Sequence, residues 1–264
     1  MNRDTSFSTL QALRCSLFFL LLGLSMVLWA PVVLASRPFP RARRYHLARV
    51  WLRFHAWILR WIVGLRFTVQ GLEHLPPGPA VVLCKHQSML ETFLLPLILP
   101  PQTWVLKREL LRIPLFGPCM ALMEPIAIDR EQPRTALKEV LVQGQDRLRQ
   151  GLWVVVYPEG TRVAPGASRP YNKGGAWLAQ RAGVPVVPIA IDTGLFWPGA
   201  SWRIRPGTIH LVIGPSIETD GRDADAINDE ARDWIETTSR RLAGFSAEMH
   251  AQGTAQKDDV NRVN

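Results

Sequence analysis

The sequence feature that most limits what this chain can fold into is an uncharged apolar stretch near its N-terminus. Residues Cys15 to Ala35 read CSLFFLLLGLSMVLWAPVVLA and hold no charged side chain. About 20 such residues suffice to cross the hydrocarbon core of a bilayer. The stretch therefore predicts a membrane-associated helix that Pro31 kinks or ends. A cleaved signal peptide is the alternative, because VLA before Ser36 resembles a processing site.

The net charge of +9 also belongs to the N-terminal part of the chain. Residues 1–70 contain ten arginines and one acid, Asp4, so the rest of the chain is balanced. Four of the arginines follow the apolar stretch directly, at positions 37, 41, 43 and 44. Positive charge favours the cytoplasmic side of a membrane, so we expect an inner-membrane protein whose main domain is cytoplasmic.

A second N-terminal segment, 47–65, is expected to form a basic amphipathic helix. Arg49, Arg53 and Arg60 share one helical face. The opposite face is an apolar stripe of Trp51, Phe54, Ile58, Trp61 and Leu65. Such a helix suits a membrane interface, although a core-packing helix with a solvated face has the same pattern. Arginines interleaved with Trp, Leu and Phe argue against nucleic acid as the partner.

From residue 66 the chain alternates short apolar runs with helical patterns. We expect strands at 67–70, 79–85, 103–107, 125–129, 152–157, 185–191 and 208–213. The expected helices are 89–98, 108–123, 133–149, 173–182 and 223–243. This alternation predicts an α/β domain, with a mixed, largely parallel sheet flanked by helices. The chain would then divide into membrane-anchoring helices (1–65), a main domain (66–246) and a polar, disordered tail (247–264).

Several polar residues follow directly on expected strands. These are His86, Lys107, Arg130 and the segment PEGTR, residues 158–162. In open α/β sheets, ligands bind outside the carboxyl ends of the strands. Cations gathered at one such edge, with Lys173 in the nearby YNKGG segment, indicate an anionic ligand, and the fork of an arginine suits a phosphate.

The segment KHQSMLET, residues 85–92, has two interpretations. An imidazole titrates near pH 6.5, so His86 could serve as a base with Glu91 as its carboxylate partner. The two side chains can meet only if His86 precedes the helix and Glu91 lies in its first turn. Alternatively, Ser88 and Glu91 match a capping box, in which the carboxylate reaches back to a backbone amide.

Other chemistries find little support in the sequence. It contains no HExxH, no P-loop and no GxSxG nucleophile elbow, so we expect no metal and no cofactor. The cysteines at positions 15, 84 and 119 form no CxxC pair. Cys84 could act as a nucleophile beside His86, but a small buried hydrophobe is the more ordinary role of a cysteine on a strand.

Four segments in order resemble the sequence blocks of the glycerolipid acyltransferases, specifically the 1-acylglycerol-3-phosphate acyltransferases. The segments are KHQSMLE, PIAIDR, YPEGTR and VPVVPIAI, and the resemblance covers about residues 66–215. The family pattern usually has Asp where this chain has Glu91, and often Asn where it has Lys85.

The resemblance implies a role for each block. His86 would be the general base and Glu91 its partner. The acceptor's phosphate would be held by Arg130, Glu159, Gly160, Thr161 and Arg162, together with Lys107. Lys173 is added to this group by its charge and place in YNKGG, not by the resemblance. The fourth block, around Val187, Pro188 and Ile189, would be structural or would line the acyl site.

The implied reaction is transfer of an acyl group from acyl-CoA or acyl carrier protein to the hydroxyl of 1-acylglycerol-3-phosphate, giving phosphatidic acid. The same residues leave other readings open. Another lysolipid, such as a lyso-ornithine lipid, could be the acceptor. A non-catalytic membrane protein that binds lipids, or a signal-cleaved periplasmic protein, would have the same basic edge.

Overall fold

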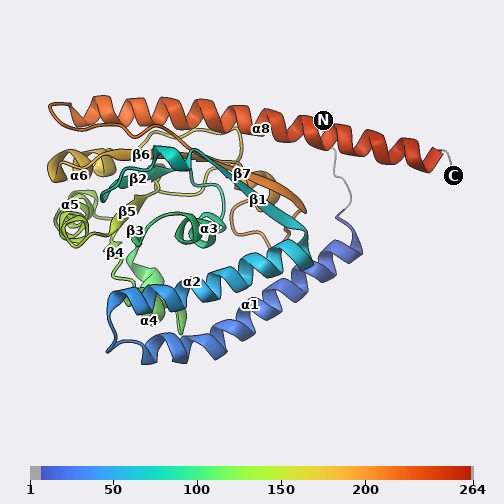
Figure 1. The fold of residues 1–264 in the computed structure, drawn as a ribbon, viewed down its shortest axis with the longest axis horizontal. Coiled ribbons are helices and arrows are strands. Elements are labelled where there is room, and N and C mark those ends of the chain that lie inside the picture. The colour runs from blue at the N-terminus through green and yellow to red at the C-terminus, as the bar shows by residue number, and fades with distance from the viewer. Residues whose placement is uncertain (1–6, 263–264) are drawn as a thin grey trace.

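The computed structural model describes the backbone of residues 7–262 and the side chains of residues 7–244. Within these residues the chain builds one seven-stranded sheet in the order β1-β7-β6-β2-β5-β3-β4 (Figure 1). The strands are β1 (Leu65–Gln70), β2 (Val81–Cys84), β3 (Gln102–Lys107), β4 (Ile126–Ile128), β5 (Trp153–Val156), β6 (Val186–Ile191) and β7 (Gly207–Ile213). Each coincides with an expected strand to within a few residues.

The sheet is mixed and largely parallel, as expected. Strands β6, β2, β5, β3 and β4 run parallel to one another, whereas β7 is antiparallel to β6, and β1 is parallel to β7. Strand β2 lies at the centre, pairing Leu83 with Val156 of β5 and Cys84 with Ile189 of β6. The carboxyl ends of β2, β3, β4 and β5 therefore lie at one edge of the sheet. That edge carries the polar residues singled out in the sequence.

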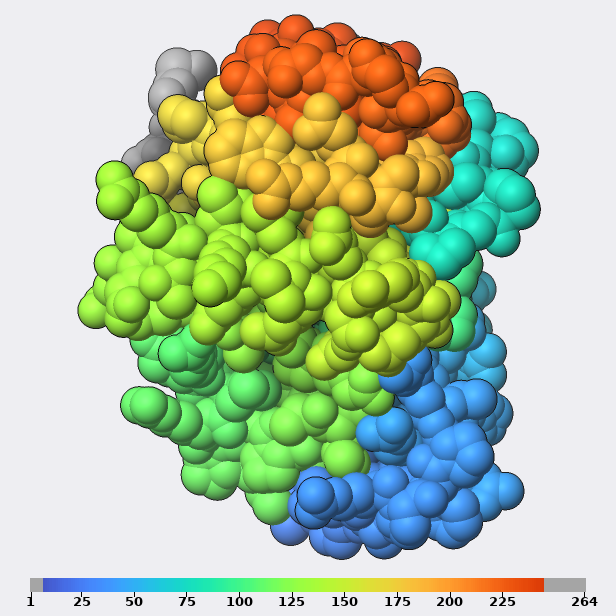
Figure 2. Space-filling model, turned by 90° about the vertical axis from the view of Figure 1, so that its left-hand side faces the viewer, coloured from blue at the N-terminus to red at the C-terminus, as the bar shows by residue number. Residues whose placement is uncertain are grey.

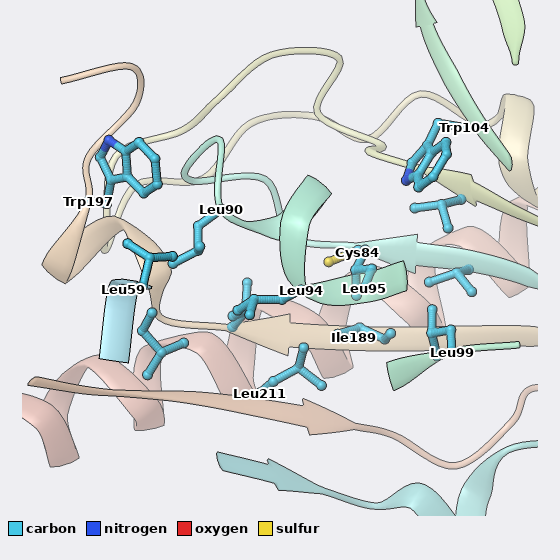
Figure 3. Packing of buried hydrophobic residues seen from close by; sticks show 14 of the residues in the cluster. Leu59, Cys84, Leu90, Leu94, Leu95, Leu99, Trp104, Ile189, Trp197 and Leu211 are labelled. Carbon is cyan, nitrogen blue, oxygen red and sulfur yellow. The ribbon is translucent and has the colours of Figure 1, made fainter. Parts of the chain in front are cut away.

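Helices cover both faces of the sheet. One face packs against α5 (Pro133–Arg149), α6 (Gly174–Ala182) and α8 (Ala224–Arg262) through residues such as Leu141, Leu178 and Ile227. The other face packs against α3 (Glu91–Ile98). Figure 3 shows Leu90, Leu94, Leu95 and Leu99 lying over the strands that carry Cys84 and Ile189. Strand β2 is therefore buried on both faces, which explains its unbroken apolar sequence VVLC.

The N-terminal segments pack beside α3 on that second face. Helices α1 (Thr9–Ala35) and α2 (Arg41–Ile58) lie side by side along the base of the molecule (Figures 1 and 2). Phe18 of α1 and Ile58 of α2 are fully buried in the same core as α3. The other side of α1 exposes a row of leucines, at positions 13, 17, 20, 24 and 28. Of the helices that the structure describes, only α1 is long and apolar enough to cross a membrane.

The second N-terminal helix differs from the expected 47–65. It begins at Arg41, and after Ile58 it continues as a π-helical turn, Leu59–Val63, that ends at Gly64. The wider turn changes which residues face inward, because each residue advances less around the axis. Ile58 and Leu65 of the expected apolar stripe are buried, whereas Phe54 and Trp61 are exposed. The stripe is therefore shared between the core of the protein and its surface.

Three other segments depart from the expected helices. The expected helix 108–123 is broken into a 3-10 helix, Arg108–Arg112, and α4 (Phe116–Ala121), because Pro114 cannot continue it and Leu115 has a φ of 62°. A short helix, α7 (Thr193–Phe196), was not expected. Helix α8 continues to Arg262, which corrects the expected disorder from residue 247. No proline occurs after Pro215 to stop this helix.

Candidate active site

The loop that carries His86 accepts backbone hydrogen bonds from the segments that follow the two neighbouring strands, β5 and β6. The Val163 amide donates to the His86 carbonyl at 2.7 Å, and the Gly199 amide donates to the Gln87 carbonyl at 3.0 Å. The Gln87 side-chain oxygen also accepts a hydrogen bond from the Gly194 amide at 3.0 Å. The loop after β2 is therefore connected to the loops that follow β5 and β6. These contacts hold His86 at the edge of the sheet.

His86 and Glu91 lie together. Nδ1 of His86 is 3.3 Å from Oε2 of Glu91, an ion-pair distance without the alignment of a hydrogen bond. The imidazole stacks on the Tyr157 ring, with centroids 4.0 Å apart and planes 18° from parallel. Burial raises the pKa of the Tyr157 hydroxyl, which keeps this stacking partner neutral. With Nδ1 directed at Glu91, Nε2 is left as the nitrogen that can take a proton from a substrate.

The Glu91 carboxylate is fully buried and reaches back to backbone amides, as in the expected capping box, but α3 begins at Glu91 with Leu90 and not Ser88 as its N-cap. It accepts the Ser88 amide at 2.9 and 3.0 Å and the Gln87 amide at 3.1 Å. The Thr193 hydroxyl donates a further hydrogen bond to Oε1. The same carboxylate thus reaches back to backbone amides and lies against the imidazole, so the two interpretations of KHQSMLET are geometrically compatible.

Thr193 is a site residue that the sequence reasoning missed. It begins α7, directly after β6, and is fully buried. The fourth block, VPVVPIAI, appeared to lack a polar side chain, but Thr193 stands two residues after its end. Its position past the carboxyl end of a central strand was the available signal. The same argument from the end of a strand singled out His86.

Cys84 is not placed as a nucleophile. It belongs to β2, is fully buried and forms part of the apolar core. Burial raises the pKa of its thiol well above the usual value, and the charges of Glu91 and Glu159 raise it further. A reactive cysteine needs the opposite shift, because the thiolate is the nucleophile.

Three of the expected phosphate-binding cations occupy the sheet edge. Lys107 ends β3 and lies 3.2 Å from Glu109, with both side chains nearly half exposed. Arg130 follows β4. Burial lowers the pKa of its guanidinium, Glu109 opposes the shift, and the nearby charge of Arg162 adds to it. Arg162 directly precedes Val163, whose amide binds the His86 carbonyl. Arg130 and Arg162 therefore lie near each other, and Arg162 lies near the base.

Other expected binding residues have different surroundings. Lys173 forms an ion pair at 2.5 Å with Asp225, in the first turn of α8. Gly160 has a φ of 67°, which makes the turn after Tyr157, and Thr161 is exposed in that turn. The Glu159 side chain points into the protein, where its Oε1 lies 3.3 Å from Nζ of the buried Lys85. The structure thus groups Lys107, Arg130 and Arg162 at the sheet edge. Glu159 and Lys173 instead form ion pairs with Lys85 and Asp225, respectively.

Comparison with known proteins shows the family to which the chain belongs. Residues 66–192 match the family model described as Acyltransferase. The chain is 44% identical over 242 residues to a 1-acyl-sn-glycerol-3-phosphate acyltransferase of Pseudomonas aeruginosa, covering 89% of this chain and 94% of the relative. The chain belongs to the acyltransferase family. It is an enzyme of the 1-acyl-sn-glycerol-3-phosphate acyltransferase type.

More distant relatives of this acyltransferase carry similar names. The human 1-acyl-sn-glycerol-3-phosphate acyltransferase alpha is 32% identical over 191 residues, which cover 70% of this chain and 68% of the relative. The crystal structure of the 1-acyl-sn-glycerophosphate acyltransferase from Thermotoga maritima superimposes with a TM-score of 0.73 at 21% identity. It covers 88% of this chain and 95% of that chain. At that identity the likeness concerns the fold.

Removing the Thr193 hydroxyl should lower the activity of this acyltransferase without unfolding it. The expected loss for Thr193→Val is about 10-fold, because residues that orient a catalytic group typically contribute 10–100-fold. Thr219→Val is the matched control, since Thr219 is also buried and donates a hydrogen bond, to the Val184 carbonyl. Equal activity of the two variants in an acyl-transfer assay would show that Thr193 does not orient Glu91.

The buried Glu159 should make stability depend on pH. Burial raises the pKa of Glu159 from 4.5 to about 7, although the charge of Lys85 lowers it. Between these values the folded state holds a proton that the unfolded state has released, so stability falls as the pH rises. The stability of Glu159→Gln relative to wild type should therefore increase by up to about 3 kcal/mol from about pH 5 to about pH 8. Thermal unfolding in detergent measures this difference, and a constant difference would contradict the assignment.

Proposed function

We propose that this enzyme transfers a fatty acyl group from an acyl thioester to the free hydroxyl of 1-acylglycerol-3-phosphate, forming phosphatidic acid. The observation that carries the proposal is the pairing of His86 with the buried Glu91 beside a cluster of cations. The relatives from Pseudomonas aeruginosa and human are 1-acyl-sn-glycerol-3-phosphate acyltransferases, which supports this acceptor. The donor is acyl-CoA or an acyl carrier protein, and no further cofactor takes part.

The reaction proceeds through a single base. Nε2 of His86 removes the proton of the acceptor hydroxyl while the oxygen attacks the thioester carbonyl carbon. The tetrahedral intermediate collapses, the C–S bond breaks, and the thiolate receives the proton from the imidazolium. A thiol has a pKa near 8.5, so it is a good leaving group that needs little acid assistance. Glu91 stabilises the imidazolium and keeps its ring oriented.

The cations of the sheet edge bind the acceptor. Arg130 and Arg162 supply planar guanidinium groups, which suit the oxygens of a phosphate, and Lys107 adds a third positive charge. Glu109 partly neutralises this cluster in the absence of ligand. Binding the phosphate here places the glycerol hydroxyl near His86. Positioning of this kind can contribute more to the rate than the base itself.

The N-terminal helices associate the enzyme with the membrane that holds its lipid substrate. The exposed leucines of α1 form an apolar surface that water does not favour. Trp57 and Trp61 are also exposed, and tryptophan is enriched at membrane–water interfaces. The arginines after α1 support a position of the catalytic domain on the cytoplasmic side of the inner membrane. Acyl-CoA and acyl carrier protein are then available from the same side.

Substitutions separate the base from the phosphate-binding group. His86→Ala should reduce thiol release from acyl-CoA by about 10²–10⁴-fold, since that is the usual contribution of a general base. Arg162→Ala should raise KM for lysophosphatidate and have less effect on a lysolipid without a phosphomonoester. Arg169→Ala is the matched control, because Arg169 is an exposed arginine of the same loop.

Three results would contradict this proposal. Near-wild-type activity of His86→Ala would exclude His86 as the base. A wild-type enzyme that prefers another lysolipid would change the acceptor. A protein that binds lipid but releases no thiol would be a binding protein.

A further inference from the structure

The residue before the catalytic histidine is a lysine whose side chain is almost completely buried. Lys85 is 1% exposed, and its Nζ lies 2.5 Å from Oε1 of Glu236, 3.2 Å from the Ala167 carbonyl and 3.3 Å from Glu159. A buried ammonium group is costly unless it is paired and hydrogen-bonded. The three partners satisfy this requirement. They belong to α8 and to the loop after β5, both distant in sequence from Lys85.

The carboxylate of Glu236 also binds the far end of that loop. The Tyr171 hydroxyl donates to Oε1 of Glu236 at 3.0 Å. Lys85 and Glu236 together thus contact the loop 157–173 near its start, in its middle and near its end, through Glu159, Ala167 and Tyr171. The base of the loop is closed by Asn172, whose amide and side chain both donate to the Pro158 carbonyl.

This loop carries Arg162, and its conformation sets where the guanidinium lies. The Val163 amide joins the centre of the loop to the His86 carbonyl, and Tyr157 at its start stacks on the imidazole. Lys173 at its end pairs with Asp225 of α8. Lys85 and Glu236 add the buried contacts at Glu159, Ala167 and Tyr171. A displacement of the loop would therefore move Arg162 relative to His86.

We propose that Lys85 and Glu236 form a buried clamp that holds the loop 157–173 in the conformation in which Arg162 binds the acceptor's phosphate. Glu236, on the C-terminal helix, is then a positioning residue for acceptor binding. The inference rests on the proposed function, because it takes the phosphate of the acceptor as the ligand of Arg162.

Stability alone does not account for this cluster. Replacing a buried ion pair by apolar residues of similar volume is often neutral or stabilising, so the pair is weak evidence for a stabilising role. A buried polar network can instead select one conformation of a loop. The contacts with three separate positions of a single loop fit that second role.

The charges of the cluster show that Glu236 is a better residue to substitute in a test than Lys85. Without Lys85, the carboxylates of Glu159 and Glu236 would be left buried without their cation. Without the Glu236 carboxylate, Lys85 keeps Glu159 as its partner. Substitution of Glu236 therefore removes the buried link between α8 and the loop and leaves Lys85 with Glu159 as its carboxyl partner.

The test compares Glu236→Leu and Glu236→Gln with wild type in the full-length enzyme, using acyl-CoA and a lysophosphatidate. Glu236→Leu should raise KM for lysophosphatidate about 10-fold, which is typical for loss of a residue that orients a binding group. KM for acyl-CoA should stay unchanged and kcat should change less than KM for the acceptor. The acceptor KM of Glu236→Gln should lie between those of wild type and Glu236→Leu, because the amide oxygen can still accept hydrogen bonds from Lys85 and Tyr171. Asp233→Asn is the matched control on the exposed side of the same helix and should behave as wild type.

The outcomes distinguish this inference from the proposed function. A wild-type enzyme without activity on lysophosphatidate would refute the proposed function. An active wild type with Glu236 variants of unchanged acceptor KM would refute the clamp, as would a loss confined to kcat or to the amount of folded protein. If Glu236→Leu does not fold, the acceptor KM of Glu236→Gln decides.

Discussion

The buried carboxylate of Glu91 is the constraint on which the rest of the site depends. A carboxylate without exposure to water must be paired or hydrogen-bonded, or it would be neutralised. Here two successive backbone amides, the Thr193 hydroxyl and the His86 ring surround it. The chain between β2 and α3 has to curl around this group, and that curl places His86 outside the helix. One carboxylate therefore both shapes this connection and lies against the base.

The parallel sheet supplies the second half of the site. Because β2 lies between β5 and β6, the loops after these three strands meet at one edge. One loop holds the base, the next holds Arg162, and the third holds Thr193. The strands β3 and β4 extend the same edge with Lys107 and Arg130. Residues far apart in sequence thus combine into a base and an anion-binding cluster without long connections.

Much of this arrangement follows from sequence patterns, and the exceptions have physical reasons. The strands could be predicted because buried parallel strands are short apolar runs, as VVLC and WVVV show. The meeting of His86 with Glu91 follows from the local connection between strand and helix, and that of Arg130 with Arg162 from the common edge at which parallel strands end. Sequence spacing does not show which way a side chain points, so it could not reveal that Glu159 turns inward to Lys85 or that Lys173 pairs with Asp225. Likewise, the helical periodicity of the sequence does not reveal the π-helical turn that contains the exposed Trp61.

The central claim is that the acceptor's phosphate binds the cations of the sheet edge while its hydroxyl reaches His86. A structure of the His86→Ala or wild-type enzyme with a bound lysophosphatidate tests this directly. The account predicts the phosphate against Arg130 and Arg162, and, in the wild type, the free hydroxyl about 2.6–3.2 Å from Nε2 of His86. A phosphate bound away from these arginines, or a hydroxyl out of reach of the imidazole, would contradict it.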